Sequence, residues 1–338
     1  AALPFIAACG GMLLPVLIFM SICPPGSEGG QGLAIPMATD IAFSLGVLSL
    51  LGSRVPLSLK IFLTAFAVVD DIGGILVIAI FYSSHVSYGY ILVAVLLYIL
   101  LYFIGKRGAT NKIFFLVIGV VIWYLFLQSG IHSTISGVIL AFVIPAKPRL
   151  DVGKYIEHIR HTIAGFPVME SGSIVLTNEQ IAKLKEVESA SDRVISPLQS
   201  FEDNLHGAVN YLILPLFAFV NAGVVFSGGG ELVGDVGIAV AAGLLFGKFA
   251  GIYFFTWLAI KIKLTPMPPG MTWTNLSGIA LLGGIGFTVS LFIANLSFGA
   301  NFPILLNQAK FGVLSGTILS GLLGYIVLWI VLPARRRK

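Results

Sequence analysis

AVVDDIGGILVIAIF (residues 67–81) places two adjacent aspartates, Asp70 and Asp71, in a run that is otherwise wholly apolar. Measured free energies of helix insertion into membranes show that a carboxylate at the centre of a membrane helix costs roughly 2.5–3.5 kcal/mol. Ionisable residues inside a membrane are functional candidates for that reason. The stretch therefore predicts both a membrane span and a functional site within it.

The composition of the whole chain agrees with a membrane protein. Of its 338 residues, 57% are hydrophobic and only 10% are charged, and the mean hydropathy is +0.99. A soluble domain carries about 25% charged residues, so a single soluble core is excluded. A bilayer core of about 30 Å needs about 20 apolar residues per helix. On this basis we expect an all-α polytopic membrane protein with ten spans, near residues 2–23, 33–51, 57–82, 88–104, 113–127, 130–145, 206–226, 235–260, 274–297 and 306–333.

The spans predict three parts in chain order. Residues 1–145 form a first membrane bundle of about six helices, 146–205 a cytoplasmic polar insert, and 206–333 a second bundle of about four helices. Within the insert, Thr177 and Gln180 have the spacing of a capping box at the start of a short amphipathic helix. A solvated or membrane-surface helix is the simplest interpretation of that segment.

The basic residues predict the orientation. With both chain ends in the cytoplasm, 18 of the 20 Lys and Arg residues fall on the cytoplasmic side. Only Lys310 is then outside, and Lys248 lies within a span. This bias follows the positive-inside rule for membrane proteins.

Apart from charges near the ends of spans, three acids and one base lie inside the predicted spans, namely Asp40, Asp70, Asp71 and Lys248. Asp40, Asp70 and Lys248 lie 13 to 16 residues from a basic residue at the inner face, or about 20 Å at 1.5 Å per residue. Their common depth predicts one central polar site. An ion pair that only holds helices together is the alternative, but one lysine neutralises only one of two adjacent acids.

Neighbouring residues on a helix point about 100° apart, so Asp70 and Asp71 cannot face one narrow site equally. We expect one of them to face Lys248 and the other a water-filled funnel. Burial and a nearby like charge both favour the protonated form of a carboxyl group. Such a group can exchange a proton for a hard cation such as sodium, which prefers oxygen ligands. No cofactor is required.

Two predicted spans are interrupted by helix breakers. Pro36 precedes Thr39 and Asp40 in the span near 33–51, and three glycines precede Thr288 in the span near 274–297, namely Gly283, Gly284 and Gly286. Such breaks leave main-chain groups bare, which a membrane tolerates only at a protein-lined or watery site. Asp40 could offset the positive ends of half-helices, and Lys248 the negative ends.

The sequence resembles the NhaA sodium/proton antiporter family. The resemblance covers about residues 1–332 and rests on five blocks, AIPMATDIAFSLGVLSLLGSRVPLSLKIFL, AVVDDIGG, HGAVNYLILPLFAFVNAGV, GLLFGKFAGI and GGIGFTVSLFIANLSF. It implies an inverted-repeat fold with two discontinuous, crossing helices. Members typically have twelve spans, so we expect that the chain lacks the first two, and the insert is longer than is usual.

The resemblance also implies roles for individual residues. Asp71 corresponds to the main cation-binding carboxylate, for Na⁺ or Li⁺, and Asp70 to its proton-carrying neighbour, paired with Lys248. Thr39 and Asp40 correspond to residues at the crossing of the broken helices. Glu202 and His206 match a region of the inner face linked to pH sensing.

The family further implies pH-regulated exchange of Na⁺ or Li⁺ for H⁺ across a bacterial inner membrane. Two titrating carboxyls permit more than one proton per sodium, which would make exchange electrogenic. A homodimer in the lipid bilayer is expected, and no nucleic-acid partner. An enzyme is not expected.

Two other classes of membrane protein are alternatives to an antiporter. A sodium-coupled solute symporter would need an additional pocket for an organic substrate, and no charged residue remains to hold one. An intramembrane aspartyl protease also uses two aspartates, but on separate helices, whereas Asp70 and Asp71 are adjacent. A membrane-peptide cleavage assay would separate the protease from the antiporter.

Overall fold

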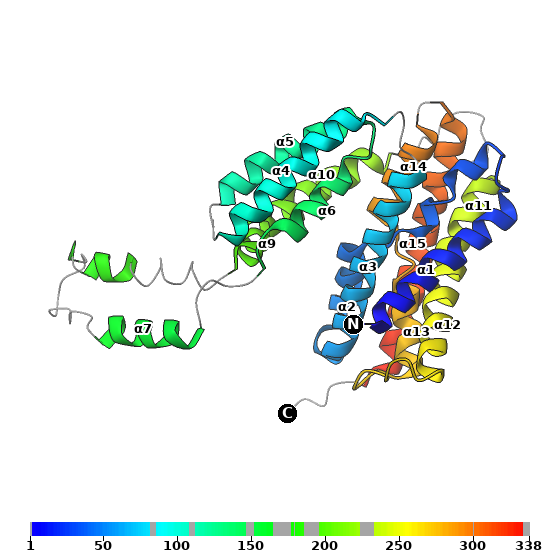
Figure 1. Ribbon diagram of the computed structural model, residues 1–338. Coiled ribbons are helices and arrows are strands. Elements are labelled where there is room, and N and C mark those ends of the chain that lie inside the picture. Colours follow the sequence, from blue (N-terminus) through cyan, green and yellow to red (C-terminus); the bar gives the residue numbers. More distant parts are fainter. Residues whose placement is uncertain are drawn as a thin grey trace. The chain divides into compact units, whose positions relative to one another are not determined.

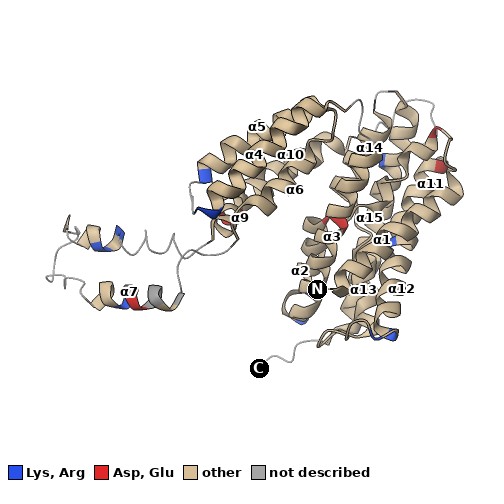
Figure 2. Ribbon diagram, in the orientation of Figure 1, with Lys and Arg blue, Asp and Glu red and all other residues tan. Residues whose placement is uncertain are grey.

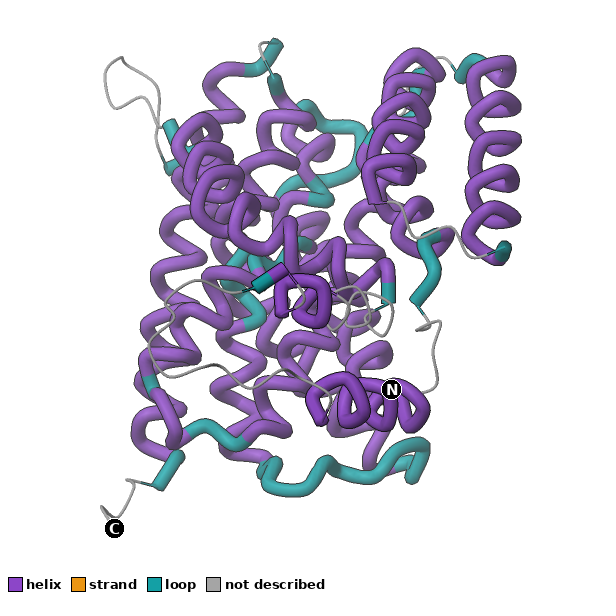
Figure 3. The backbone as a smooth tube through the Cα atoms, turned by 90° about the vertical axis from the view of Figure 1, so that its left-hand side faces the viewer, coloured by secondary structure: helices purple, strands orange, loops and turns teal. Residues whose placement is uncertain are grey.

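The computed structural model consists of helices joined by loops, and no strand is present in the part that it describes (Figures 1 and 3). The described residues are 2–81, 86–107, 112–146, 152–164, 177–178, 180–185, 196–223, 233–299 and 301–333. An all-α polytopic fold is therefore confirmed.

The described α-helices lie mostly within the predicted spans. They are α1 (Ala2–Ile22), α2 (Ile41–Leu50), α3 (Leu57–Phe81), α4 (Tyr88–Lys106), α5 (Lys112–Ser129), α6 (Thr134–Val143), α7 (Val152–Ala164), α9 (Pro197–Ala208), α10 (Leu214–Asn221), α11 (Asp235–Ala242), α12 (Lys248–Lys261), α13 (Trp273–Leu282), α14 (Phe287–Phe298) and α15 (Pro303–Val331). Short 3-10 helices at Gly29–Gly32 and Ile35–Met37 precede α2. Two π-helical turns, Val209–Ile213 and Gly243–Gly247, join α9 to α10 and α11 to α12.

Six helices of the described part are long and apolar enough to cross a membrane, or eight if each of two bent pairs is counted as one span. This is fewer than the ten spans predicted. The segment near 130–145 forms only the ten-residue α6, and the segment near 206–226 is divided among α9, a π turn and the eight-residue α10. Hydropathy finds apolar residues, but it does not register where a helix is interrupted.

The chain forms two compact units, and these do not follow chain order. Residues 1–83 and 213–338 make the first unit, and residues 84–212 make the second. The division into 1–145, 146–205 and 206–333 remains a prediction based on polarity along the chain. Spatial grouping depends instead on which helices pack together.

The first unit is held together by close approaches between small residues. The backbones of Gly10 on α1 and Gly251 on α12 are in direct contact, and Gly237 on α11 touches Gly312 on α15. Small residues at such positions are typical of membrane helix pairs, because lipid supplies no hydrophobic drive and contact depends on close packing. Figure 2 shows that the helices of this unit carry few charged residues along their lengths, with an acidic position on α3.

The two bent pairs lie in this same unit. Gly29–Met37 and Ile41–Leu50 meet at 46°, and α13 and α14 meet at 44°. Pro36 lies in the 3-10 helix before the first bend, and Gly283, Gly284 and Gly286 span the second. The breakers identified in the sequence therefore coincide with the bends.

The second unit packs α4, α5, α6 and α9 around a small core that includes Leu101, Phe115 and Ile122. The Tyr98 hydroxyl of α4 donates to the main-chain oxygen of Ser136 on α6 at 2.7 Å. Helix α9 begins at Pro197, because the Ser196 side chain accepts the Gln199 N–H and proline suits the first helical position. The predicted boundary at 205/206 therefore falls inside a helix.

The capping box of the insert is confirmed. The Thr177 hydroxyl accepts the Gln180 N–H at 3.3 Å, and the Gln180 side chain accepts the Thr177 N–H at 2.9 Å. Much of the remaining insert lies outside the described residues, including 165–176 and 186–195.

Lys310 lies near the start of the span predicted at 306–333, and its position on the outer side stays a prediction. It is part of α15 and is largely buried, and its ammonium donates to the main-chain oxygen of Gly223, just beyond the end of α10, at 2.9 Å. A cation beside the carbonyls at a helix C-terminus is stabilised by the helix dipole. This contact explains why the lysine is tolerated within an apolar helix.

Candidate functional site

The two broken spans are hydrogen-bonded to each other at their breaks. The Asp40 N–H donates to the Ile285 carbonyl at 2.6 Å, and the Thr39 hydroxyl donates to the Gly283 carbonyl at 2.8 Å. One turn further along, the Ser44 hydroxyl donates to the Leu282 carbonyl at 3.0 Å. Each interruption thus supplies the partners that the other lacks.

The Asp40 carboxylate joins the starts of two helices. Its Oδ1 accepts the Phe43 N–H at 3.0 Å, and its Oδ2 accepts both the N–H and the hydroxyl of Thr288, at 3.0 and 2.6 Å. Phe43 lies in the first turn of α2 and Thr288 in the first turn of α14. A negative charge at the partly positive ends of two helices is electrostatically favourable. The predicted contact of Asp40 with half-helix ends is confirmed.

Asp70 and Lys248 form a buried ion pair. The Lys248 ammonium donates to Asp70 Oδ2 at 2.6 Å, and both side chains are wholly buried. The ammonium also lies 5.6 Å from the centre of the Phe66 ring. Asp70 is near the middle of α3, and Lys248 is near the middle of the 27-residue segment Asp235–Lys261. The predicted pairing is confirmed, and the ammonium contacts a carboxylate rather than the C-terminal end of a half-helix.

Asp71 has different surroundings from its neighbour. It is only partly buried, and one of its oxygens, Oδ1, is enclosed yet has no hydrogen-bond partner. The charges that act on it are those of Asp70, Lys248 and Asp40. Asp70 Oδ1 likewise has no partner. The two aspartates therefore keep oxygen atoms free to bind a proton or a cation.

This arrangement is suited to transient binding. No group of three or more His, Cys, Asp or Glu residues that would hold a resident metal is found in the described part of the chain. Hard cations accept carboxylate, carbonyl and water oxygens, and carboxylates and main-chain carbonyls are what the breaks and the aspartates provide. The chemistry available is competition between a hard cation and protons for the same oxygens.

Comparison with known proteins agrees with this chemistry. The family model described as Na⁺/H⁺ antiporter 1 matches residues 1–328. The chain belongs to this antiporter family. It is 94% identical over 338 residues to the Na⁺/H⁺ antiporter NhaA of Bacteroides thetaiotaomicron. The match covers the whole of this chain and 77% of that protein. It is also 80% identical over 336 residues to the NhaA of Bacteroides fragilis (99% and 77% covered), and 62% identical over 335 residues to that of Phocaeicola vulgatus (98% and 75% covered).

Glu202 and His206, the residues that resemble the pH-sensing region of the family, do not belong to the same unit as the aspartates. Both lie on α9, one helical turn apart, and both are exposed. The side-chain nitrogen of Asn210 lies 3.0 Å from Nε2 of His206.

Sequence reasoning missed several supporting groups of this antiporter site. The Ser290 hydroxyl donates to the Ile35 carbonyl at 2.8 Å, and the Thr317 hydroxyl of α15 accepts the Phe287 N–H at 3.2 Å. The π turn Gly243–Gly247 directly before Lys248 was also missed. The signal was weak, because single hydroxyls and glycines are common in membrane helices.

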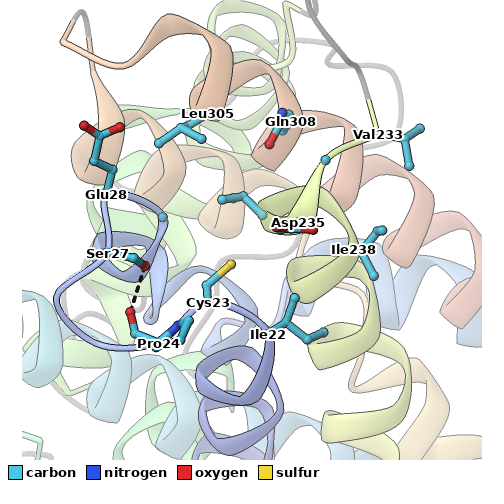
Figure 4. A pocket seen from close by; sticks show the side chains of 13 residues that line it. Ile22, Cys23, Pro24, Ser27, Glu28, Val233, Asp235, Ile238, Leu305 and Gln308 are labelled. Carbon is cyan, nitrogen blue, oxygen red and sulfur yellow. Dashed lines mark hydrogen bonds between the residues drawn. The ribbon is translucent and has the colours of Figure 1, made fainter.

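A separate pocket of about 460 Å³ lies at one end of the first unit, between the end of α1 and the starts of α11 and α15 (Figure 4). Its polar lining includes Glu28, Asp235 and Gln308. Cys23 also lines it, and burial raises the pKa of this thiol, with a further contribution from the charge of Asp235.

Proposed function

We propose that this chain exchanges Na⁺ or Li⁺ for H⁺ across a bacterial inner membrane, with Asp71 as the main cation ligand. The observation that carries the proposal is the enclosed, unpartnered oxygen of Asp71 beside the buried Asp70–Lys248 pair. Membership of an antiporter family supports a transporter rather than an enzyme. The relatives are named Na⁺/H⁺ antiporters, and we propose the same exchange for this chain.

The proposed mechanism is competition. When a cation binds at Asp71, its charge favours loss of protons from both carboxyls. The deprotonated Asp70 can then pair with Lys248, as it does in the structure described here. When the cation departs, two carboxylates in a poorly hydrated site repel each other and take up protons again. Alternating access to the two sides then converts this competition into exchange.

Three finer features belong to the same proposal. Two titrating carboxyls allow more than one proton per cation, which would make exchange electrogenic. Glu202 and His206 are the proposed pH sensors, because they are titratable and exposed on α9. A homodimer with both ends of the chain in the cytoplasm is proposed from the family resemblance and the charge bias.

The deciding experiment is sodium-driven proton movement in proteoliposomes. Wild-type protein should move protons when sodium is added, and Asp71→Asn should abolish the movement at every pH. Asp70→Asn should retain some cation binding but change the number of protons moved per sodium. Glu28→Gln is the matched control, because it removes an acid that is exposed and lies outside the aspartate site. Full exchange by Asp71→Asn would remove Asp71 from the mechanism.

A further inference from the structure

Ser320 carries a polar group that the site described above does not use. It lies on α15, its side chain is wholly buried, and its hydroxyl has no hydrogen-bond partner. Buried hydroxyls are nearly always paired, so an unpaired one calls for a physical explanation. By contrast, the Thr317 hydroxyl, three residues earlier on the same helix, accepts the Phe287 N–H.

The position of this hydroxyl links it to the transport site. A Cβ atom built on Gly284 would meet the Ser320 hydroxyl at 2.5 Å and would collide with the main-chain oxygen of Leu244. Gly284 belongs to the break between α13 and α14, and Leu244 to the π turn that ends just before Lys248. The hydroxyl, the break and the π turn therefore meet around one glycine.

A π turn holds one residue more than an α-helical turn needs, and such turns often mark functional sites. If the turn at Gly243–Gly247 rearranges, the carbonyls in it lose their partners and must find others. The Ser320 hydroxyl is a free donor, and it and the Leu244 carbonyl both lie within 2.5 Å of where a Cβ on Gly284 would stand. Its lack of a partner in the described state leaves it available for another state.

We propose that Ser320 is a positioning residue for exchange, whose hydroxyl donates to the Leu244 carbonyl in an access state other than the one described here. In that state, the π turn ahead of Lys248 is rearranged, so the contact helps to set where the lysine lies. The inference rests on the proposed exchange function. A hydrogen bond present in only one of two states shifts their equilibrium by about two- to tenfold.

The test compares Ser320→Ala with Ser315→Ala. Ser315 lies on the same helix, but its hydroxyl already donates to its own helix, to Phe311 and Gly312. Ser320→Ala should keep or raise the melting temperature, since it removes an unpaired buried group, and should lower the maximal sodium-driven exchange rate about two- to tenfold. Ser315→Ala should leave that rate unchanged, and Ser320→Thr, which keeps the hydroxyl, should restore most of it.

Hydrogen–deuterium exchange of the peptide covering residues 243–249 supplies a readout besides activity. Sodium should change its exchange in the wild type, and by less in Ser320→Ala. An unchanged rate, a slow rate combined with a lowered melting temperature, or a Ser320→Thr protein that folds normally but stays slow would each overturn the proposal. If wild-type protein moves no protons, the proposed function fails instead, and the hydrogen–deuterium comparison still tests Ser320.

Discussion

At the scale of single residues, Asp70 and Asp71 are adjacent in sequence but differ in their partners. Asp70 is neutralised by Lys248 in a fully buried pair, whereas Asp71 is partly buried and has an oxygen without a partner. The helical twist between neighbours causes this difference, since it turns the two side chains about 100° apart. One carboxyl is thus held by the protein, and the other is open to an ion.

The ion pair predicts an asymmetric response to mutation. Lys248→Ala should destabilise the protein by about 3–5 kcal/mol, because it leaves Asp70 buried without a counter-charge. The double variant Lys248→Ala with Asp70→Asn should recover part of that loss. Thermal unfolding in detergent measures both.

Lys261→Ala is the matched control, because this lysine lies at the end of the same helix, exposed, over the Trp257 ring. It should change the melting temperature only slightly. Equal losses for Lys248→Ala and the double variant would show that the charge of Asp70 is not what destabilises the single variant.

Cys23, in the pocket at the end of α1, predicts slow labelling of its thiol. Burial and the charge of Asp235 raise the pKa of this thiol, so less thiolate, the reactive form, is present at a given pH. In a Cys9→Ala background, Asp235→Asn should lower that pKa and speed maleimide labelling at pH 8. Burial still limits the rate, so labelling should remain slower than that of free cysteine, and no acceleration by Asp235→Asn would contradict the prediction.

At the scale of elements, the two broken spans stabilise each other through main-chain groups. Asp40 accepts N–H groups at the starts of both α2 and α14, and Thr39 donates to a carbonyl at the end of α13. These bonds hold the breaks together inside the protein, where an unpaired main-chain group is costly.

Helix contact through glycine predicts a second effect at this scale. Gly251→Ala would place a methyl group against the Gly10 backbone and should destabilise the α1–α12 pair by about 1–3 kcal/mol. Gly46→Ala is the control, since a Cβ there meets nothing and alanine favours a helix. The measurement is the unfolding temperature of each variant compared with wild type. A Gly251→Ala protein as stable as wild type would show that α1 and α12 can move apart without loss of stability.

At the scale of the whole molecule, the distribution of basic residues predicts the orientation in the membrane. In a background without native cysteines, a membrane-impermeant maleimide added to intact cells should label Ser27→Cys, in the loop after α1. It should not label Glu157→Cys on α7. Both positions are exposed, so accessibility to the reagent is matched. Labelling of Glu157→Cys alone would reverse the proposed orientation.

Competition for one site predicts how exchange depends on pH. Each proton that must leave before a cation binds raises the apparent KM for sodium by up to about tenfold per unit fall in pH. We therefore expect the KM to rise steeply from pH 8.5 to 6.5, with the maximal rate much less affected. Sodium titrations in proteoliposomes at fixed pH measure this, and a constant KM would exclude direct competition.

The sequence alone determined the membrane class, most of the helices, the breakers and the charged residues of the site. These features depend only on the residues of one segment. The length of an apolar run, a proline or glycine that breaks a helix, and the cost of a charge in a membrane can each be read from that segment. Asp40, Asp70, Asp71 and Lys248 were identified in this way, since each is too costly in an apolar segment to be incidental.

Only the tertiary structure decided which groups meet. It joined Asp40 to Thr288 and Ser44 to Leu282, across separations of 248 and 238 residues. It also brought the Lys310 ammonium to the Gly223 carbonyl and the free hydroxyl of Ser320 to Gly284. Such pairings depend on the packing of helices far apart in sequence, whose close approach is set by small residues and main-chain contacts that leave no periodic signal along the chain.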